Sequence, residues 1–287
     1  MNNYIIYTDS ACDVSTSLLR EWGVCVSSLS FRFDHEDREY TNEEMPISEF
    51  YEKMREGFRA KTSAVNVSVF QTEFEKLLQA GFDILYIGFA SSLSATYNSA
   101  EMAARNLREK YPERKILTVD TLCASAGHAM IVKHAVRKKA EGASIEEAAA
   151  SAKDLSSRVC HWITVDDLVY LKRGGRISPT TALVGKALGI KPLIYINAEG
   201  KLNNLDKARG KKKAMMALAD YYGKTAKALH GDVYIAHSEY SDCVDLLTGI
   251  LQERYNACVA LVTDIGPVVG THIGPGGMIF AYEGKQR

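Results

Sequence analysis

Excess charge, long apolar runs and paired cysteines are all missing from this sequence of 287 residues. Lys and Arg together number 35, as do Asp and Glu, so no net charge exists to gather nucleic acid or an anionic membrane. No apolar run is long enough to span a bilayer, and the amino terminus lacks the basic and apolar regions of a secretory signal. These absences predict a soluble, cytoplasmic protein that binds no nucleic acid and does not insert stably into membranes.

The cysteines are scattered along the chain, and no C-x-x-C pair occurs. This spacing argues against a disulfide framework and against a zinc site, so we expect no bound metal. The simplest interpretation is that all six are buried, reduced thiols. They are Cys12, Cys25, Cys123, Cys160, Cys243 and Cys258.

Short β-rich runs alternate with amphipathic helical stretches along the whole chain. This alternation is typical of α/β proteins with largely parallel sheets covered by helices. The predicted strands are Tyr4–Tyr7, Ile84–Ile87, Ile116–Val119, Val159–Val165, Leu193–Ile196, Val233–Ala236, Val259–Val262 and Met278–Tyr282.

The length of the chain and its hydrophobic content of 46% predict two packed cores. We place the domain boundary near residue 157, which gives an N-terminal α/β domain of residues 1–157 and a C-terminal α/β domain of residues 158–287. No repeat or long linker separates the two parts, so we expect them to press directly against each other. A ligand would then be expected in the cleft between them.

Two helix starts carry the pattern of a capping box, in which two side chains satisfy otherwise unpaired backbone amides. The first is Ser68-x-x-Gln71, followed by an apolar stripe at Phe70, Phe74, Leu77 and Leu78. The second is Ser144-x-x-Glu147, which precedes an alanine-rich stretch.

Hydroxyl-rich segments recur next to predicted strands. Thr8-Asp9-Ser10 follows the first strand, at the end where ligands bind in open α/β sheets. Lys61-Thr62-Ser63 and Ser91-Ser92-Leu93-Ser94-Ala95-Thr96-Tyr97 offer further hydroxyls, and the second of these opens a helix whose amides and dipole favour an anion. The alternative for each is simple capping of a turn or helix.

Two glycine-rich segments lie in the second half of the chain. In Lys172-Arg173-Gly174-Gly175-Arg176 cations flank glycines that permit a close approach of the backbone, although solvated surface arginines are an equal alternative. The loop from Asp264 to Gly277 contains Gly-Thr-His around His272, and so specific a backbone is seldom only a connector.

In this order and spacing, the five segments resemble the DegV family of bacterial fatty-acid-binding proteins over essentially the whole chain. The resemblance implies two α/β domains with a tunnel between them that encloses the acyl chain of a long-chain fatty acid. It implies a carrier, not an enzyme, with the fatty acid as ligand and no cofactor. Some members present the bound carboxylate to a separate fatty acid kinase, which is therefore the expected partner.

The resemblance also assigns residues to the head group. Thr62 and Ser94 would hydrogen-bond the carboxylate, with Ser63 beside Thr62 in the candidate set, while Arg173 and His272 would supply positive charge and order. Ser92 and Ala95 stand where the family usually has glycines, and Ala64-Val65-Asn66 replaces its usual Gln-Pro-Ser. Ser91 therefore stays a candidate beside Ser94.

A basic stretch outside these segments lies at a predicted helix start and contains Arg209, Lys211, Lys212 and Lys213. We interpret it either as a solvated helix start or as a surface that helps to dock the kinase.

A serine-dependent lipid hydrolase or esterase is the main alternative function, with Ser94, His272 and Asp264 as a triad. No Gly-x-Ser-x-Gly nucleophile turn occurs in the sequence, which disfavours it. A phosphate-binding loop at Gly223-Lys224-Thr225 is excluded because position 218 is leucine instead of glycine, and we expect these residues on a helix.

Overall fold

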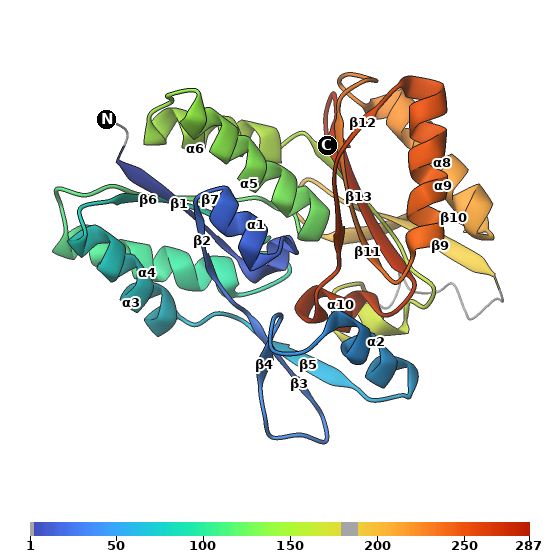
Figure 1. The fold of residues 1–287 in the computed structure, drawn as a ribbon, viewed down its shortest axis with the longest axis horizontal. Helices are drawn as coiled ribbons and strands as arrows, with labels where there is room; N and C mark the ends of the chain where they lie inside the picture. The colour runs from blue at the N-terminus through green and yellow to red at the C-terminus, as the bar shows by residue number, and fades with distance from the viewer. Residues whose placement is uncertain (1–2, 179–188) are drawn as a thin grey trace.

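The computed structural model describes residues 3–178 and 189–287, which form two α/β halves and a small projecting arm (Figure 1). The first half is built on a sheet of four parallel strands in the order β2-β1-β6-β7. Strands β1 (Tyr4–Asp9) and β6 (Asp83–Gly88) are almost wholly buried in its centre, with β2 (Val24–Ser27) and β7 (Ile116–Asp120) at the edges. Continuous apolar runs suit such strands, because both faces of a parallel sheet are covered.

Helices cover both faces of this sheet. Helices α3 (Val67–Gln79) and α4 (Thr96–Lys110) lie on one face, and α5 (Ser125–Ala140) and α6 (Ile145–Ser156) lie on the other (Figure 1). The predicted apolar stripe of α3 is confirmed by the buried side chains of Phe70, Phe74 and Leu78. A short helix, α1 (Thr16–Glu21), packs beside β2.

The two predicted capping boxes had different outcomes. The box at Ser144 and Glu147 is confirmed, with each side chain bonded to the other residue's backbone amide. The box at Ser68 was wrong, because α3 begins two residues earlier and the side chain of Asn66 accepts from the amide of Val69 at 3.0 Å. Asn66 is at least as good a cap as serine, so the helix starts there.

The arm runs from β3 (Ser30–Phe33) through β4 (Tyr40–Thr41) and α2 (Ile47–Arg55) to β5 (Ala60–Ser63). Its three strands form a small antiparallel sheet in the order β4-β3-β5. This sheet was not predicted from the sequence pattern. It matters for the site because β5 carries Thr62.

The second half is built on a sheet of six strands in the order β10-β9-β8-β13-β11-β12. Only the β11–β12 pair is parallel, so the expectation of a largely parallel sheet was wrong for this half. The strands are β8 (Val159–Thr164), β9 (Ile190–Ile196), β10 (Leu202–Arg209), β11 (Asp232–Ser238), β12 (Cys258–Asp264) and β13 (Gly277–Glu283). Helices α8 (Lys211–Thr225) and α9 (Ser241–Tyr255) cover one face.

Helix α5 joins the two halves. It packs against β1 and β6 of the first sheet and against β8, β11 and β13 of the second (Figure 1). A helix placed between two sheets must be apolar on most sides, and the first half of α5 is buried from Ser125 to Val132. The halves therefore pack directly against each other, as predicted. The boundary near residue 157 stays a prediction; α6 ends at Ser156 and β8 begins at Val159.

The remaining helices lie between the halves. Helix α7 (Val169–Arg173) packs against α10 (Pro267–Ile273), and α10 also contacts α2, β3 and β5 of the arm. The hydroxyl of Tyr51 on α2 donates to the carbonyl of Ile265 at 2.7 Å, which fixes the arm to the second half.

The cysteines are free, as predicted, but they are not all buried. Cys25 is half-buried, and Cys258 is exposed because it opens the edge strand β12. Within the described ranges, 3–178 and 189–287, no helix combines the length and the apolar character that crossing a bilayer requires.

Candidate functional site

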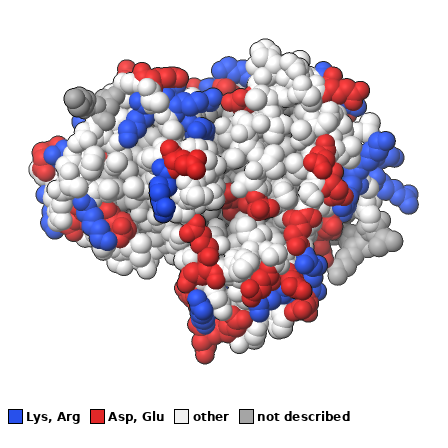
Figure 2. All heavy atoms as spheres, in the orientation of Figure 1, with Lys and Arg blue, Asp and Glu red and all other residues white. Residues whose placement is uncertain are grey.

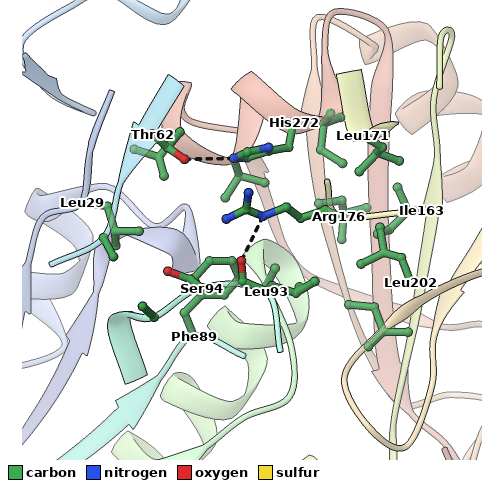
Figure 3. Close-up of a pocket in the computed structure, with 18 residues that line it drawn as sticks. Leu29, Thr62, Phe89, Leu93, Ser94, Ile163, Leu171, Arg176, Leu202 and His272 are labelled. Atoms are coloured by element: carbon green, nitrogen blue, oxygen red, sulfur yellow. Dashed lines mark hydrogen bonds between the residues drawn. The ribbon is translucent and has the colours of Figure 1, made fainter. Parts of the chain in front are cut away.

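A cavity of about 230 Å³ lies between the two halves (Figure 3). Most of its wall is apolar. Leu29, Phe89 and Leu93 come from the N-terminal half, and Ile163, Leu202 and Ile279 come from the C-terminal half. Four polar side chains also reach it, namely Thr62, Ser94, Arg176 and His272. Such a cavity suits a ligand with a long apolar part and one polar end.

Thr62 and His272 meet at the polar part of the cavity. The Nε2 atom of His272 lies 3.0 Å from the Oγ1 atom of Thr62. The Nδ1 atom of His272 is buried and lacks a hydrogen-bond partner among the described residues. The imidazole packs closely on Gly174, where any Cβ atom would collide with it, so the glycine in the Arg-Gly-Gly-Arg turn makes room for the histidine.

Burial keeps His272 neutral. Burial, together with the positive charge of Arg176, lowers the pKa of the imidazole to about 4. The expectation that His272 supplies positive charge therefore does not hold at neutral pH. If the Nε2 atom carries the proton, it donates to Thr62, and the Thr62 hydroxyl proton is then free to donate to a ligand.

Arg176 is the cation inside the cavity. Its side chain is half-buried, and its Nε donates to the Leu93 carbonyl at 3.0 Å while Nη1 donates to the Gly174 carbonyl. Figure 3 shows the guanidinium between the Thr62–His272 pair and Ser94. Desolvation lowers the pKa of Arg176, and within the described ranges no carboxylate forms an ion pair with it. A half-buried cation without a counter-ion favours an anionic ligand.

Ser94 lies on the opposite side of Arg176 from Thr62 (Figure 3). Its Oγ atom is 2.9 Å from the Oγ1 atom of Thr96 and accepts from the Thr96 amide at 3.2 Å. Ser94 therefore closes a turn just before α4, whose N-cap residue is Ala95, and also lines the cavity. Its predicted bond to the ligand stays a prediction.

The other predicted site residues lie outside this cavity. The Ser63 hydroxyl points away from it and donates to Glu39 at 3.2 Å. Ser91 is held through its backbone amide, which donates to Asp120, and it does not line the cavity. Arg173 is exposed at the end of α7 and lines a neighbouring cavity. Arg176, three positions further on, lines the inner cavity, and the role predicted for Arg173 stays a prediction.

The acidic turn after β1 is structural. The Asp9 carboxylate is fully buried and accepts from the Tyr86 hydroxyl at 2.7 Å and from the Phe89 amide at 2.9 Å. The Ser10 hydroxyl accepts from the Leu29 amide at 2.9 Å. These bonds place Phe89 and Leu29 on the cavity wall, so the turn shapes the site without lining it.

The geometry does not support the hydrolase alternative. His272 contacts Thr62, whereas Ser94 contacts Thr96, and Asp264 lies 3.8 Å from His237 instead of supporting His272. A catalytic triad needs a continuous chain from nucleophile to base to carboxylate. Gly223-Lys224-Thr225 lies within α8, as expected. In the parts of the chain that the structure describes, no cluster of His, Cys, Asp or Glu is suited to hold a metal ion.

Comparisons with known proteins agree with this geometry. A family described as "Uncharacterised protein, DegV family" matches residues 4–284. A DegV domain-containing protein from Clostridium perfringens is 36% identical over 289 residues, covering 100% of this chain and 99% of its own length.

Two solved structures are similar over nearly the whole chain. A DegV family protein from Thermus thermophilus, described for its fatty acid binding, is 30% identical with a TM-score of 0.88, covering 98% of this chain and 99% of its own. The Streptococcus pneumoniae fatty acid kinase B3 protein, loaded with linoleic acid, is 21% identical with a TM-score of 0.86 and covers 98% of this chain and 99% of its own. At that identity, the second comparison shows a shared fold.

Proposed function

The chain belongs to the DegV family, and from that premise we propose that it binds one long-chain fatty acid in the cavity between its halves. The observation that carries the proposal is Arg176, a half-buried guanidinium with no carboxylate partner among the described residues, placed in a largely apolar cavity. A fatty acid supplies the missing anion and an apolar chain to fill the remaining space. The fatty acid binding described for the Thermus thermophilus relative supports the same ligand class.

The head group has three donors available. Arg176 offers its Nη2 group, for which the described residues provide no hydrogen-bond partner. Ser94 offers a hydroxyl, and Thr62 offers a hydroxyl proton once His272 Nε2–H donates to it. A carboxylate removed from water needs such partners, since leaving it without hydrogen bonds costs several kcal/mol. His272 then acts by orienting Thr62 and does not need to carry charge.

The acyl chain supplies most of the affinity in this proposal. Burial of each methylene is worth roughly 0.8 kcal/mol, so a sixteen-carbon chain gains on the order of 10 kcal/mol before the costs of binding. The apolar wall contributed by both halves suits this role. The polar end fixes which way the ligand lies, and the tail determines how tightly it is held.

We infer further that the protein is a carrier and that a separate fatty acid kinase acts on the exposed end of its ligand. The arrangement of Ser94, His272 and Asp264 lacks the contacts of a hydrolase, which favours a carrier over an esterase. The shared fold with the fatty acid kinase B3 protein is consistent with this partner.

Native mass spectrometry of protein purified without delipidation, followed by lipid extraction, tests the function. The expected result is one fatty acid per folded chain. Delipidated protein should rebind palmitate and should not react with a fluorophosphonate probe. Folded protein that carries no lipid and does not bind added palmitate would refute the proposal, and covalent labelling of Ser94 by the probe would favour the hydrolase.

A further inference from the structure

His161 is a buried histidine that the proposed head-group site does not use. Charged side chains are spread over the face of the molecule that Figure 2 shows, whereas His161 lies in the interior with an exposed fraction of 1%. Among the described residues, neither the Nδ1 nor the Nε2 atom of its ring has a hydrogen-bond partner. Buried polar atoms are nearly always hydrogen-bonded, so two unpartnered nitrogens on one ring require an explanation.

The position of His161 on β8 places it next to the cavity between the halves. Side chains alternate across a strand, so His161 points to the same face of the sheet as Ile163, which lines the cavity. The register that pairs Trp162 with Tyr195 puts His161 opposite Ile196, which also lines the cavity. His161 therefore lies at a corner between two residues of the apolar wall.

This corner belongs to the part of the cavity remote from the head-group donors. Figure 3 shows Leu202 on the side of Ile163 that faces away from His272. Leu202 pairs with Ile196, and Ile196 lies opposite His161, so these three residues form one row across the sheet. A fatty acid with its carboxylate at the polar end therefore brings the remote half of its chain toward His161.

Helix α5 bounds the same corner from the other side. A Cβ atom on Gly127 would lie 3.5 Å from the Cγ atom of His161 and 3.2 Å from the Sγ atom of Cys123. Ala124, about one turn before Gly127, lines the cavity. Because Gly127 has no side chain, the imidazole packs directly against the helix at the boundary of the cavity.

The imidazole of His161 is neutral. Burial lowers its pKa to about 3, and the positive charge of Arg287 acts in the same direction. A neutral imidazole has one nitrogen that donates a hydrogen bond and one that accepts, and a hydroxyl group can match either of them. A carboxylate can only accept, and the methylene groups of a saturated chain can do neither. The chemical complement of this ring is therefore a hydroxyl.

We propose that His161 is a specificity-determining residue, which selects fatty acids that carry a hydroxyl group in the half of the chain remote from the carboxylate. The proposal rests on the proposed function, because it needs the carboxylate near Thr62 and Arg176 and the chain along the apolar wall. The hydroxyl bonds to the ring nitrogen that faces the cavity. A saturated chain in the same place keeps water from the ring and offers no bond in return.

Positional isomers of one hydroxy fatty acid provide the test. Affinities are measured by calorimetry for octadecanoate and for octadecanoates hydroxylated at carbon 10, 12 or 18. 2-Hydroxyoctadecanoate is the ligand control, since its hydroxyl lies beside the carboxylate. The variants are His161→Leu, which removes both ring nitrogens, and His161→Gln, which keeps a donor and an acceptor. The matched control is His134→Leu, because His134 lies outside the cavity with its Nε2 atom 2.7 Å from the Ser151 hydroxyl.

Wild type should bind at least one of the three remote hydroxy acids about tenfold or more tightly than octadecanoate. His161→Leu should abolish this preference and change octadecanoate affinity by less than about threefold, and His161→Gln should retain part of the preference. His134→Leu should keep the full preference, and 2-hydroxyoctadecanoate should bind wild type and His161→Leu alike. Thermal denaturation confirms that each variant is folded, and His161→Gln decides the role of the ring if His161→Leu does not fold.

A wild type with no preference for any of the three remote hydroxy acids would overturn the role of His161 and leave fatty acid binding intact. That result is the one expected if a buried water, and not the ligand, satisfies the ring. A preference that survives in His161→Leu would overturn it as well, because the hydroxyl would then bond elsewhere. Wild type that binds none of these acids, octadecanoate included, would overturn the proposed function itself.

Discussion

His272 Nε2 lies 3.0 Å from Thr62 Oγ1, although the two residues are 210 positions apart in the sequence. Thr62 is on β5 of the arm and His272 is on α10 of the second half. The polar part of the cavity therefore exists only when the arm is seated on α10.

Thr62→Val should weaken palmitate binding by about tenfold to a hundredfold, because it removes a hydroxyl donor to a charged acceptor while keeping the shape of the side chain. Isothermal titration calorimetry of the delipidated protein measures this. Ser63→Ala is the matched control, since that hydroxyl bonds to Glu39 outside the cavity. Equal affinities of Thr62→Val and Ser63→Ala would show that Thr62 does not contact the carboxylate.

Arg176→Gln should reduce palmitate affinity by about tenfold or more and leave the affinity for hexadecanol nearly unchanged. The reason is that the guanidinium pairs with the negative charge of the carboxylate, and hexadecanol has no such charge. Arg173→Gln, at the exposed end of α7, should change palmitate affinity by less than about twofold. If Arg173→Gln had the larger effect on palmitate, the exchange of roles between these two arginines would be refuted.

Asp13 should make the protein less stable as pH rises from 3.8 to about 8. Burial raises the pKa of its carboxyl from 3.8 to about 8, helped by the negative charges of Asp264 and Asp9, and opposed by the hydrogen bond from the Gly266 amide. Between these two values the folded chain keeps a proton that the unfolded chain has released. The free energy of unfolding therefore falls by up to about 1.4 kcal/mol per pH unit between these two pKa values. The stabilisation that protonated Asp13 provides is lost once pH passes the pKa of the folded state.

Two buried histidines have the opposite effect at lower pH, where they make the protein more stable as pH rises. Burial lowers the pKa of His272 to about 4 and that of His161 to about 3, from 6.5 in the unfolded chain. The stabilisation from the two neutral histidines is fully present above pH 6.5 and is lost as pH falls below it. Together with Asp13, they predict that the free energy of unfolding is greatest near pH 6.5. The free energy of unfolding, measured with urea across this pH range, should decline above pH 6.5 in wild type and in the exposed control Asp37→Asn. It should not decline there in Asp13→Asn.

Arg209→Glu should reduce phosphorylation of the bound fatty acid by the cognate kinase and make the reaction less sensitive to salt. Of the predicted basic stretch, Lys211 is already engaged, because it donates to Asp242 at 2.8 Å and lies 4.4 Å from the ring centre of Tyr240. Arg209 ends the edge strand β10, where a partner can reach it. Exposed charges of this kind mainly affect the rate of encounter.

Fatty acid content should not change in Arg209→Glu, and the exposed control Arg20→Glu should behave as wild type. A loss of lipid in Arg209→Glu, or unchanged phosphorylation, would place the docking surface elsewhere.

Local sequence patterns were enough to find most of the core. The eight predicted strands all coincide with observed strands, because each is an apolar run. The fold buries most of these runs, but the residues of the edge strand β12 are half-buried or exposed. The direction of the strands in the second sheet was not predictable in the same way. Antiparallel pairing of β8 with β9 and with β13 depends on partners distant in the sequence, and an apolar run looks the same in either arrangement.

Local sequence patterns also predicted only part of the candidate site. Thr62, Ser94 and His272 were predicted and do line one cavity, but Arg173 was preferred to Arg176. Which arginine faces inward depends on how the chain leaves α7 through Gly174 and through Gly175, whose φ is 70°. The charged arm was missed because its strands are only two to four residues long and lack an apolar run.

Helix α5 also has a consequence for how the molecule unfolds. One hydrophobic cluster runs from Phe74 in the first half through Ile131 of α5 to Ile279 in the second sheet. Either half separated from the other would expose one side of this helix to water. Amides of β6 and β13 should therefore exchange their hydrogens through the same cooperative opening, and thermal denaturation should proceed in one transition instead of two.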